Sequence, residues 1–274
     1  MAAKTTQSVP ETLRRGGVML SGTRTVPEEM PIAFSIGGSS HAVMMATPDD
    51  LEDFAVGFLM NEGIIASPAD IASLEAMPAG EGIDLQMTLA GDLTEEFRGR
   101  RRAKAGPVGC GLCGVESIDE ALPEPPTVAG SSLSLSSQEI VEAVRLLDGR
   151  QPLHALTRAM HGAAFYVPGE GLLAVREDVG RHNALDKLIG ALARDGVDPR
   201  RGAVVMTSRV SVELIQKAAA AGSPFIIAIS APTALAIRTA EKAGMTIIAL
   251  VRGEEFEVFS HPERIREGAT AHVA

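Results

Sequence analysis

A repeated alternation of apolar runs and amphipathic stretches dominates the second half of the chain. The apolar runs read AVVMTS, FIIAIS and TIIALVR, and the stretches between them read VSVELIQKAAAAG and TALAIRTAEKAG. Ser208, Ser230 and Arg252 each lie at the end of one run, 22 residues apart. A strand that leads into a helix and then into another strand predicts a parallel sheet with right-handed crossovers.

The first half of the chain predicts a smaller and more mixed unit. PIAFSIGG and SHAVMMAT predict two strands joined by a Gly-Gly-Ser turn, and the alternating GIDLQMTL predicts another strand. A core-facing helix is expected between them, with Thr47 as its N-cap, Pro48 at its first position and Gly63 at its end. The whole chain is therefore expected to be an α/β protein.

These patterns divide the chain into four segments. Residues 1–30 are polar and interrupted by Gly and Pro, which predicts a flexible N-terminal arm. Residues 31–122 are expected to form a mixed α/β part, and the proline- and serine-rich residues 123–135 a linker. Residues 136–274 are expected to form the second α/β part, which begins with a serine and a glutamate in capping-box spacing.

Composition and charge limit the classes of function. A chain of 274 residues with 45% hydrophobic residues has enough apolar surface for a large core. The net charge of −10 and the pI near 5.1 argue against a protein that binds nucleic acid or an anionic membrane surface. The sequence shows no apolar run of transmembrane length and no signal-like N-terminus. We therefore expect a soluble cytoplasmic protein with neither nucleic acid nor a membrane as its partner.

Polar residues gather at the predicted carboxyl ends of the repeated strands. In an open parallel sheet the ligand site lies beyond these ends, where the loops converge. Hydroxyl groups, backbone amides at helix starts and arginines suit a phosphate or a nucleotide-like group. For each loop, the alternative that its serine or threonine is an ordinary helix cap stays open. The candidate residues are Thr207, Ser208, Arg209, Ser230, Ala231, Pro232, Thr233, Arg252, Gly253 and Glu254.

Both cysteines, Cys110 and Cys113, lie in the glycine-rich stretch GPVGCGLCGVES. No second cysteine pair or closely spaced histidine pair completes a four-ligand zinc site, so we expect no metal. A thioredoxin-type pair usually lies where a strand enters a helix, whereas these glycines indicate a loop. Persulfide transfer suits a mobile thiolate, and the upstream basic run RGRRRAK would lower the thiol pKa. From the residues alone, the redox, zinc and persulfide alternatives stay open.

The stretch REDVGRHNALDKLIG predicts the end of a strand, a turn and a helix. Asp178 or Asn183 is expected to cap that helix, and Gly190 to end it. Arg181 and His182 at the helix start would face an anion. The alternative for His182 is a satisfied histidine packed between helix and sheet.

Several blocks together resemble one known family. They are CGLCGVES, REDVGRHNALDKLIG, SAPTALAI and VRGEEFEVFSHPERI, and the similarity extends over most of the chain beyond about residue 30. The chain is similar in these blocks to the formate dehydrogenase accessory sulfurtransferases, the FdhD family. The resemblance implies a three-layer α/β fold like that of cytidine deaminases, with a largely parallel C-terminal sheet and a smaller mixed N-terminal part.

The resemblance also implies a function. It predicts a sulfur carrier, usually a homodimer, that accepts persulfide sulfur from a cysteine desulfurase on Cys110. The sulfur then passes to the molybdenum cofactor, in its bis(guanine dinucleotide) form, before insertion into the formate dehydrogenase catalytic subunit; GDP or GMP would mimic the ligand. The role of Cys113 is left open, and the alternative function is an escort that binds the cofactor or the dehydrogenase without sulfur transfer. The implied cofactor segment is Ala249, Leu250, Val251, Arg252, Gly253 and Glu254.

Overall fold

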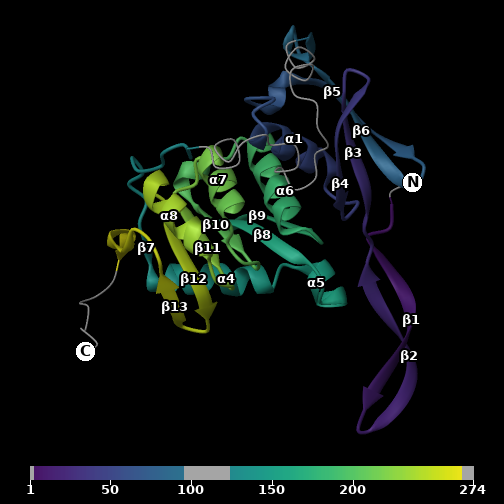
Figure 1. The fold of residues 1–274 in the computed structure, drawn as a ribbon. Helices are drawn as coiled ribbons and strands as arrows, with labels where there is room; N and C mark the ends of the chain where they lie inside the picture. The colour runs from purple at the N-terminus through teal and green to yellow at the C-terminus, as the bar shows by residue number, and fades with distance from the viewer. Residues whose placement is uncertain (1–2, 96–123, 267–274) are drawn as a thin grey trace.

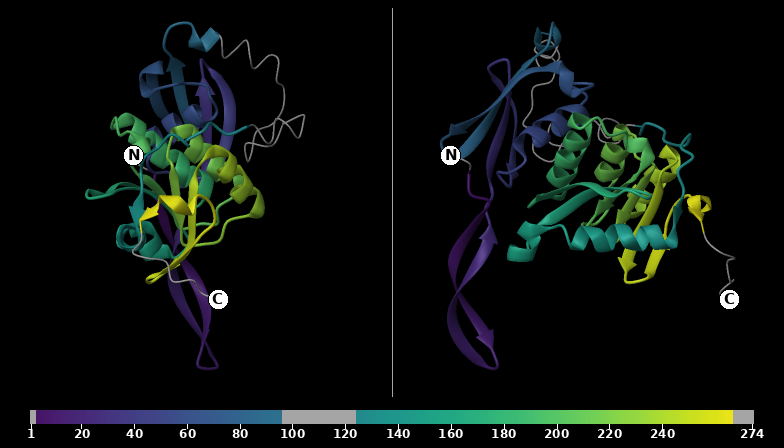
Figure 2. Two further views of the ribbon diagram at one scale, coloured as in Figure 1. Left: turned by 90° about the vertical axis from the view of Figure 1, so that its left-hand side faces the viewer. Right: turned by 180° about the vertical axis from the view of Figure 1, so that it is seen from behind.

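The computed structural model describes residues 3–95 and 124–266. These residues form an N-terminal body, a C-terminal body and a hairpin that extends away from both (Figures 1 and 2). The N-terminal body is a four-stranded sheet in the order β4 (Ser39–Ala46), β3 (Met30–Ile36), β6 (Gly82–Leu89) and β5 (Ile71–Ala79). Strands β3 and β6 run parallel and the other neighbours antiparallel.

One helix, α1 (Leu51–Asn61), covers one face of this sheet. The core beneath it is built on Phe34, which contacts the rings of Phe54 and Phe58 at centroid distances of 5.0 and 4.3 Å. A short 3-10 helix, η1 (Pro68–Asp70), leads into β5. The three strands predicted for this half are confirmed, and β5 is an additional strand that the sequence pattern did not indicate.

Residues predicted to be a flexible arm form an antiparallel hairpin. Its strands are β1 (Thr6–Arg15) and β2 (Val18–Pro27), joined at Gly16 and Gly17, both of which have positive φ angles. The prediction of an arm without regular structure is therefore wrong for this segment. Its apolar residues are few and separated by polar ones, and none is buried, so the usual signal of a strand with one buried face was missing.

The C-terminal body is built on a six-stranded mixed sheet. Its three central strands are parallel, as the repeat predicted, whereas the outer strands pair antiparallel. The expectation of a largely parallel sheet is thus right only for the centre. The order is β13 (Glu255–Val258), β12 (Thr246–Arg252), β11 (Phe225–Ala228), β10 (Ala203–Met206), β8 (His161–Val167) and β9 (Gly171–Asp178).

Helices cover both faces of this sheet, which gives three layers (Figures 1 and 2). One face packs against α6 (Arg181–Arg194), α7 (Val212–Ala221) and α8 (Ala234–Ala243), and the other against α4 (Ser137–Asp148). Helix α4 begins at Ser136, whose hydroxyl accepts a hydrogen bond from Glu139 N, so the predicted capping box is confirmed. Three layers agree with the predicted architecture, and the likeness to cytidine deaminases stays a prediction.

The described part of the predicted linker is packed against the C-terminal body. Val128 is buried in the core and its backbone N donates to Ala243 O at 2.7 Å. Further along, β7 (Leu135–Ser136) pairs with β14 (Ile265–Arg266), which follows η3 (Pro262–Arg264). Residues 124–135 therefore belong to the C-terminal body. The remaining elements are α5 (Pro152–Thr157) and η2 (Pro199–Arg201).

The two bodies meet where α1 crosses α6, and two glycines allow the close approach. A Cβ on Gly57 would lie 1.8 Å from Asp186 O, and one on Gly190 would lie 1.9 Å from Asp53 O. The prediction that Gly190 ends the helix is therefore wrong, because α6 continues to Arg194. Its role is to admit the backbone of α1.

We predict that Gly57→Ala lowers the free energy of unfolding by about 3 kcal/mol or more, because the new methyl group forces the two helices apart. Urea denaturation followed by circular dichroism measures this change. The matched control is Gly130→Ala, where nothing lies within 4 Å of the added Cβ. Equal stability of Gly57→Ala and the wild type would contradict the close crossing.

Candidate functional site

The loops that follow the central parallel strands lie side by side at one edge of the C-terminal sheet. Val210 N donates to Ala231 O at 3.2 Å, and Thr233 N donates to Val210 O at 2.9 Å. Leu250 N lies 3.5 Å from Ser230 O, which brings the end of β12 next to the loop after β11. The predicted convergence of these loops is confirmed.

Several of the hydroxyl groups predicted to bind a ligand form hydrogen bonds with the protein backbone near the sheet edge. Thr207 Oγ1 accepts from Gly162 N at 2.9 Å, and the Thr233 hydroxyl caps α8 by accepting from Ala236 N at 3.2 Å. Ser208 is buried and its hydroxyl donates to Arg209 O at 3.0 Å. The ordinary capping alternative is therefore right for Thr233. Ser230 and Pro232 are half-buried, and the exposed Arg209 is the charged side chain at this point of the edge.

The segment Ala249–Glu254 has mixed surroundings. Ala249 and Val251 are buried, whereas Arg252, Gly253 and Glu254 are exposed. Between them the pairing of β12 with β13 is irregular and Leu250 has a φ of 56°. The segment thus joins the sheet interior to an exposed turn.

Arg252 does not lie in line with the two serines. Phe225 pairs with Ala203 and with Thr246, so the second repeat is one residue shorter than the first. The residue equivalent to Ser208 and Ser230 is Val251. Strand β12 turns directly back into β13, so the polar strand end predicted at Arg252 is followed by an antiparallel strand, whereas β10 and β11 are each followed by a helix.

A cluster of ionisable side chains lies at the same edge, around the start of α6. Strand β8 is antiparallel to both β9 and β10, so β9 ends, and α6 begins, where β10 and β11 end. Arg181 and His182 form the first turn of α6 after the N-cap residue Gly180. His161, at the start of β8, pairs with Asp178 across the sheet. The sequence pattern did not single out His161, because only the strand pairing brings it here.

The side chains of this cluster differ in their charge at neutral pH. Burial, followed by the charge of Arg181, lowers the pKa of His182 to about 4. Burial and Arg181 also lower the pKa of His161. Both imidazoles are therefore uncharged at neutral pH, and Arg181 supplies the positive charge. The buried Arg181 Nε has no hydrogen-bond partner among the described residues.

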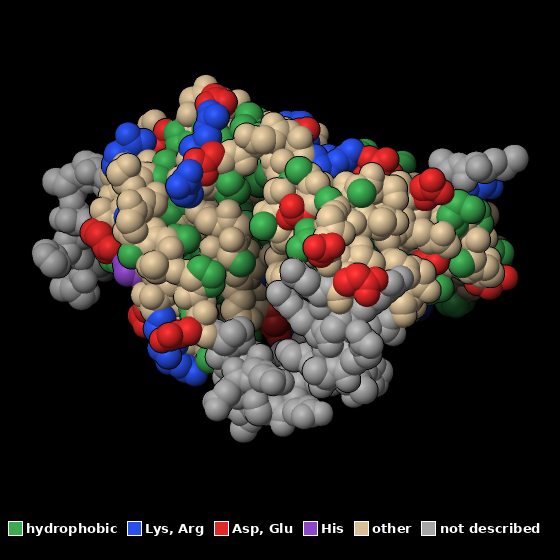
Figure 3. All heavy atoms as spheres, turned by 90° about the horizontal axis from the view of Figure 1, so that it is seen from above, with side chains coloured by type: hydrophobic (Ala, Val, Ile, Leu, Met, Phe, Trp, Pro, Cys, Tyr) green, Lys and Arg blue, Asp and Glu red, His purple; other side chains and the backbone are tan. Residues whose placement is uncertain are grey.

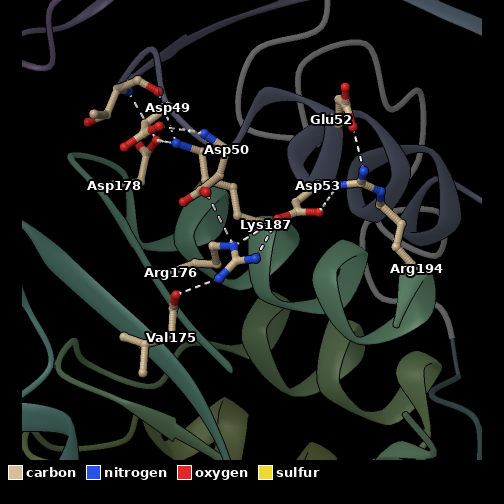
Figure 4. Close-up of polar contacts among 10 residues, drawn as sticks. Asp49, Asp50, Glu52, Asp53, Val175, Arg176, Asp178, Lys187 and Arg194 are labelled. Carbon is tan, nitrogen blue, oxygen red and sulfur yellow. Dashed lines mark hydrogen bonds and ion pairs between the residues drawn. The ribbon is translucent and has the colours of Figure 1, made fainter. Parts of the chain in front are cut away.

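The stretch from Arg176 to Gly190 also forms a buried polar joint between the bodies (Figure 4). Lys187 Nζ lies 2.7 Å from Asp178 Oδ2, and both side chains are fully buried. The backbone of Thr47 completes the group, because its N donates to Asp178 and its O accepts from Lys187. The prediction that Thr47 caps α1 is therefore wrong. The helix begins after Asp50, and the Thr47 hydroxyl accepts a hydrogen bond from Val179 N.

Asn183 extends the joint. Its side-chain amide donates to Met45 O at 2.9 Å and to Asp178 Oδ1 at 3.0 Å. Asp178 Oδ1 also accepts from Gly180 N at 2.7 Å. Neither Asp178 nor Asn183 is the N-cap residue, so that prediction is wrong, although both side chains stabilise the turn before α6.

Ion pairs surround this joint on the side of α1. Arg176 contacts Asp53 at 2.7 Å, and Arg194 contacts both Asp53 and Glu52 (Figure 4). On the α7 side, Lys217 lies 2.6 Å from the fully buried Asp186. Burial raises the pKa of Asp186, against the lowering effect of Lys217.

Cys110 and Cys113 lie outside the described residues. Within residues 3–95 and 124–266, no group of three His, Cys, Asp or Glu side chains is arranged to hold a metal ion. No helix in the same residues is long and apolar enough to cross a membrane. Over the described residues of the face in Figure 3, acidic side chains are interspersed with basic ones.

Comparison with known proteins identifies the relatives of this chain. The model of the FdhD/NarQ family matches residues 27–266. The chain belongs to the FdhD/NarQ family. Curated relatives agree, since the sulfur carrier protein FdhD of Agrobacterium fabrum is 55% identical over 257 residues, covering 94% of this chain and 95% of that protein. The sulfur carrier protein FdhD of Cupriavidus necator is 46% identical and covers 94% of this chain and 88% of the relative.

A solved structure supports the same family fold. The chain is similar to a putative formate dehydrogenase accessory protein from Desulfotalea psychrophila, with a TM-score of 0.76 and 26% identity. The match covers 96% of this chain and all of the other. The predicted FdhD resemblance is therefore confirmed.

We predict that Lys187→Met lowers the free energy of unfolding by about 3–5 kcal/mol, because Asp178 keeps its buried charge without a cation. Chemical denaturation at neutral pH measures the loss. Lys242→Met, which removes the same charge from an exposed position on α8, is the matched control and should cost less than about 1 kcal/mol. Similar stabilities for the two variants would show that the buried pair does not hold the bodies together.

Proposed function

We propose that this member of the FdhD/NarQ family is a sulfur carrier for formate dehydrogenase that takes persulfide sulfur on Cys110 and delivers it to the molybdenum cofactor. The names of its relatives support sulfur carriage and an accessory role for formate dehydrogenase. The structural observation that supports an acceptor site is the convergence of the strand-end loops beside Arg181 at one sheet edge.

The proposed chemistry is thiol–persulfide exchange. The Cys110 thiolate attacks the terminal sulfur of a persulfide on a cysteine desulfurase, forming a new S–S bond. The old S–S bond breaks, and its electron pair leaves with the desulfurase cysteine as a thiolate. No electron is gained or lost overall, so the step needs no external oxidant. The role of Cys113 is not assigned.

The acceptor is proposed to be the bis(guanine dinucleotide) form of the molybdenum cofactor, held through its phosphates. Arg181 and Arg209 supply positive charge at the sheet edge, and the backbone amides at the starts of α6 and α8 add partial positive charge. His161 and His182 contribute as neutral hydrogen-bonding groups, because their pKa values are lowered. GDP and GMP carry the same guanine and phosphate groups and serve as probes.

The proposal includes the cell compartment and partners. We place the protein in the cytoplasm as a homodimer that meets a cysteine desulfurase and the formate dehydrogenase catalytic subunit. The second candidate is an escort that binds the cofactor at the same sheet edge and carries no sulfur. The sheet-edge geometry suits both functions, so the thiol chemistry distinguishes them.

Incubation with a cysteine desulfurase and cysteine is expected to add one sulfur atom to the protein, removable by dithiothreitol. Intact-mass measurement detects it. Cys110→Ala should abolish the adduct, whereas Cys113→Ala should retain it. Persistence of the adduct in Cys110→Ala would assign the carrier role to another residue, and cofactor binding without any adduct in the wild type would favour the escort.

We expect Arg209→Ala to weaken GDP binding by about tenfold, because an arginine–phosphate hydrogen bond contributes about 1.5 kcal/mol or more. Titration calorimetry measures the dissociation constant. Arg252→Ala should have a smaller effect, since Arg252 lies on the β12–β13 turn. Arg145→Ala, an equal charge change on exposed α4, is the control. Unchanged GDP affinity in Arg209→Ala would argue against this position for the phosphates, and persulfide formation should be unaffected in all three variants.

A further inference from the structure

The N-terminal sheet is covered by a helix on only one face. Phe34, Leu85 and Met87 belong to the buried core beneath α1. Because side chains alternate along a strand, the residues next to these point to the opposite, outer face. No helix among the described residues covers the outer face, where Val43 is 49% and Met77 44% exposed (Figure 1). Large apolar side chains on an open sheet face are typical of a surface that another molecule covers.

One continuous row of side chains crosses the outer face. Val43 pairs with Ala33, and Ala33 pairs with Asp84. Asp84 pairs in turn with Met77, so each of the four strands contributes one residue to the row. Paired residues on neighbouring strands lie about 5 Å apart, and Asp84 is the one charged residue in the row. A carboxylate with apolar neighbours on both sides suits a contact that combines one ion pair with apolar packing.

A pocket opens beside Asp84 on the same face. Its volume is about 320 Å³, at the lower limit of ligand pockets, so it suits one side chain better than a dinucleotide cofactor. The polar residues that line it are Ser35, Ser73, Glu75, Asp84, Gln86 and Thr88. Carboxylate, hydroxyl and amide oxygens can all accept hydrogen bonds. The pocket therefore suits a group that carries several donors.

Asp84 has a hydrogen-bond acceptor to spare. Gln86 Nε2 donates to Asp84 Oδ2 at 3.1 Å, whereas Asp84 Oδ1 is buried and has no hydrogen-bond partner among the described residues. A buried carboxylate oxygen without a partner is costly, so it indicates an atom that receives a donor from outside the chain. The guanidinium group of an arginine matches this pocket, because it brings a positive charge and five N–H donors in one plane.

The surrounding charge favours a basic partner. Residues 25–97 contain no Lys or Arg, and apart from His41 all their ionisable side chains are Asp or Glu. On the α1 side, Arg176 and Arg194 of the C-terminal body pair with acidic residues. The ion pairs of the described residues include neither Glu75 nor Asp84. A second copy of the chain has the same net charge of −10 and is a poor match for this face.

The pocket lies on the strand that leads towards Cys110. Strand β6 carries Asp84, Gln86 and Thr88, and the described chain continues from it to Glu95. About 15 residues separate Glu95 from Cys110, so the thiol lies within about 50 Å of Glu95. A protein docked on the outer face is therefore within reach of the segment that carries the thiol.

We propose that the outer face of the N-terminal sheet docks the protein that donates sulfur to Cys110, with an arginine of that protein inserted into the pocket beside Asp84. The role of the partner as sulfur donor rests on the proposed function, whereas its basic and apolar contact surface follows from the pocket, the row and the charge. Apolar side chains of the partner pack on Val43 and Met77, which excludes water from the ion pair.

Binding of the full-length protein to a purified cysteine desulfurase, measured by surface plasmon resonance, tests this docking. Asp84→Asn should raise the dissociation constant at least about tenfold, because the arginine loses its charged partner in a contact that excludes water. Glu75→Gln, on an exposed residue of the pocket, should raise the constant less and should weaken its dependence on salt. Asp148→Asn makes the matched change at the exposed end of α4 and should have no effect.

The stability of Asp84→Asn separates docking from a structural role. The substitution removes a charge that has no ion pair in the described chain, so urea denaturation should show an unchanged or higher free energy of unfolding. A lower free energy of unfolding, or an unchanged affinity for the desulfurase, would overturn the proposal. A change in the sedimentation of Asp84→Asn alone would also overturn it, because the outer face would then join two copies of the chain.

Inorganic polysulfide, a sulfur source that needs no docking, distinguishes this proposal from the proposed function. Asp84→Asn should gain the dithiothreitol-labile sulfur from polysulfide as fast as the wild type, but more slowly from limiting desulfurase. Equal rates from the desulfurase would contradict the docking. A wild type that binds the desulfurase through Asp84 but gains sulfur from neither source would contradict sulfur carriage and support the docking surface.

Discussion

The buried ion pair of Lys187 and Asp178 is the contact on which the arrangement of the two bodies depends. Removing two charges from water is costly, and the pair tolerates it because Thr47, Gly180 and Asn183 hydrogen-bond to it. The partners come from both bodies, so the charges are satisfied in only one relative position. The ion pair therefore specifies how α1 and the N-terminal sheet sit against α6.

The same constraint sets the start of α6, and through it the sheet edge. Asp178 ends β9, receives the Gly180 amide, and thereby orients the turn that carries Arg181 and His182. The glycine crossing of α1 and α6 holds the other end of the contact. The motif that most strongly indicates the family is thus largely structural in its buried residues, while the half-buried Arg181 and His182 of its first helical turn face the candidate site.

The sequence predicted the elements whose signals are local. The parallel repeat, the capping box at Ser136 and the convergence of strand ends all follow from periodicity and residue type. The errors arise where tertiary contacts override local preference. Gly190 resembles a helix end but admits a neighbouring backbone, and Thr47 resembles a cap but serves a distant ion pair. The hairpin was missed because strand prediction relies on one buried face, which the single chain does not provide.

The balance of charge at the sheet edge connects structure to the proposed ligand. Arg181 and burial keep His161 and His182 uncharged, so the free edge carries less positive charge than its residues suggest. A phosphate bound beside Arg181 would neutralise that charge and favour protonation of both imidazoles. Ligand binding at this edge would then be linked to proton uptake, and affinity would increase as the pH falls towards the histidine pKa values. Such a linkage would make the binding of an anionic ligand at this edge reversible near neutral pH, as the proposed delivery of a cofactor requires.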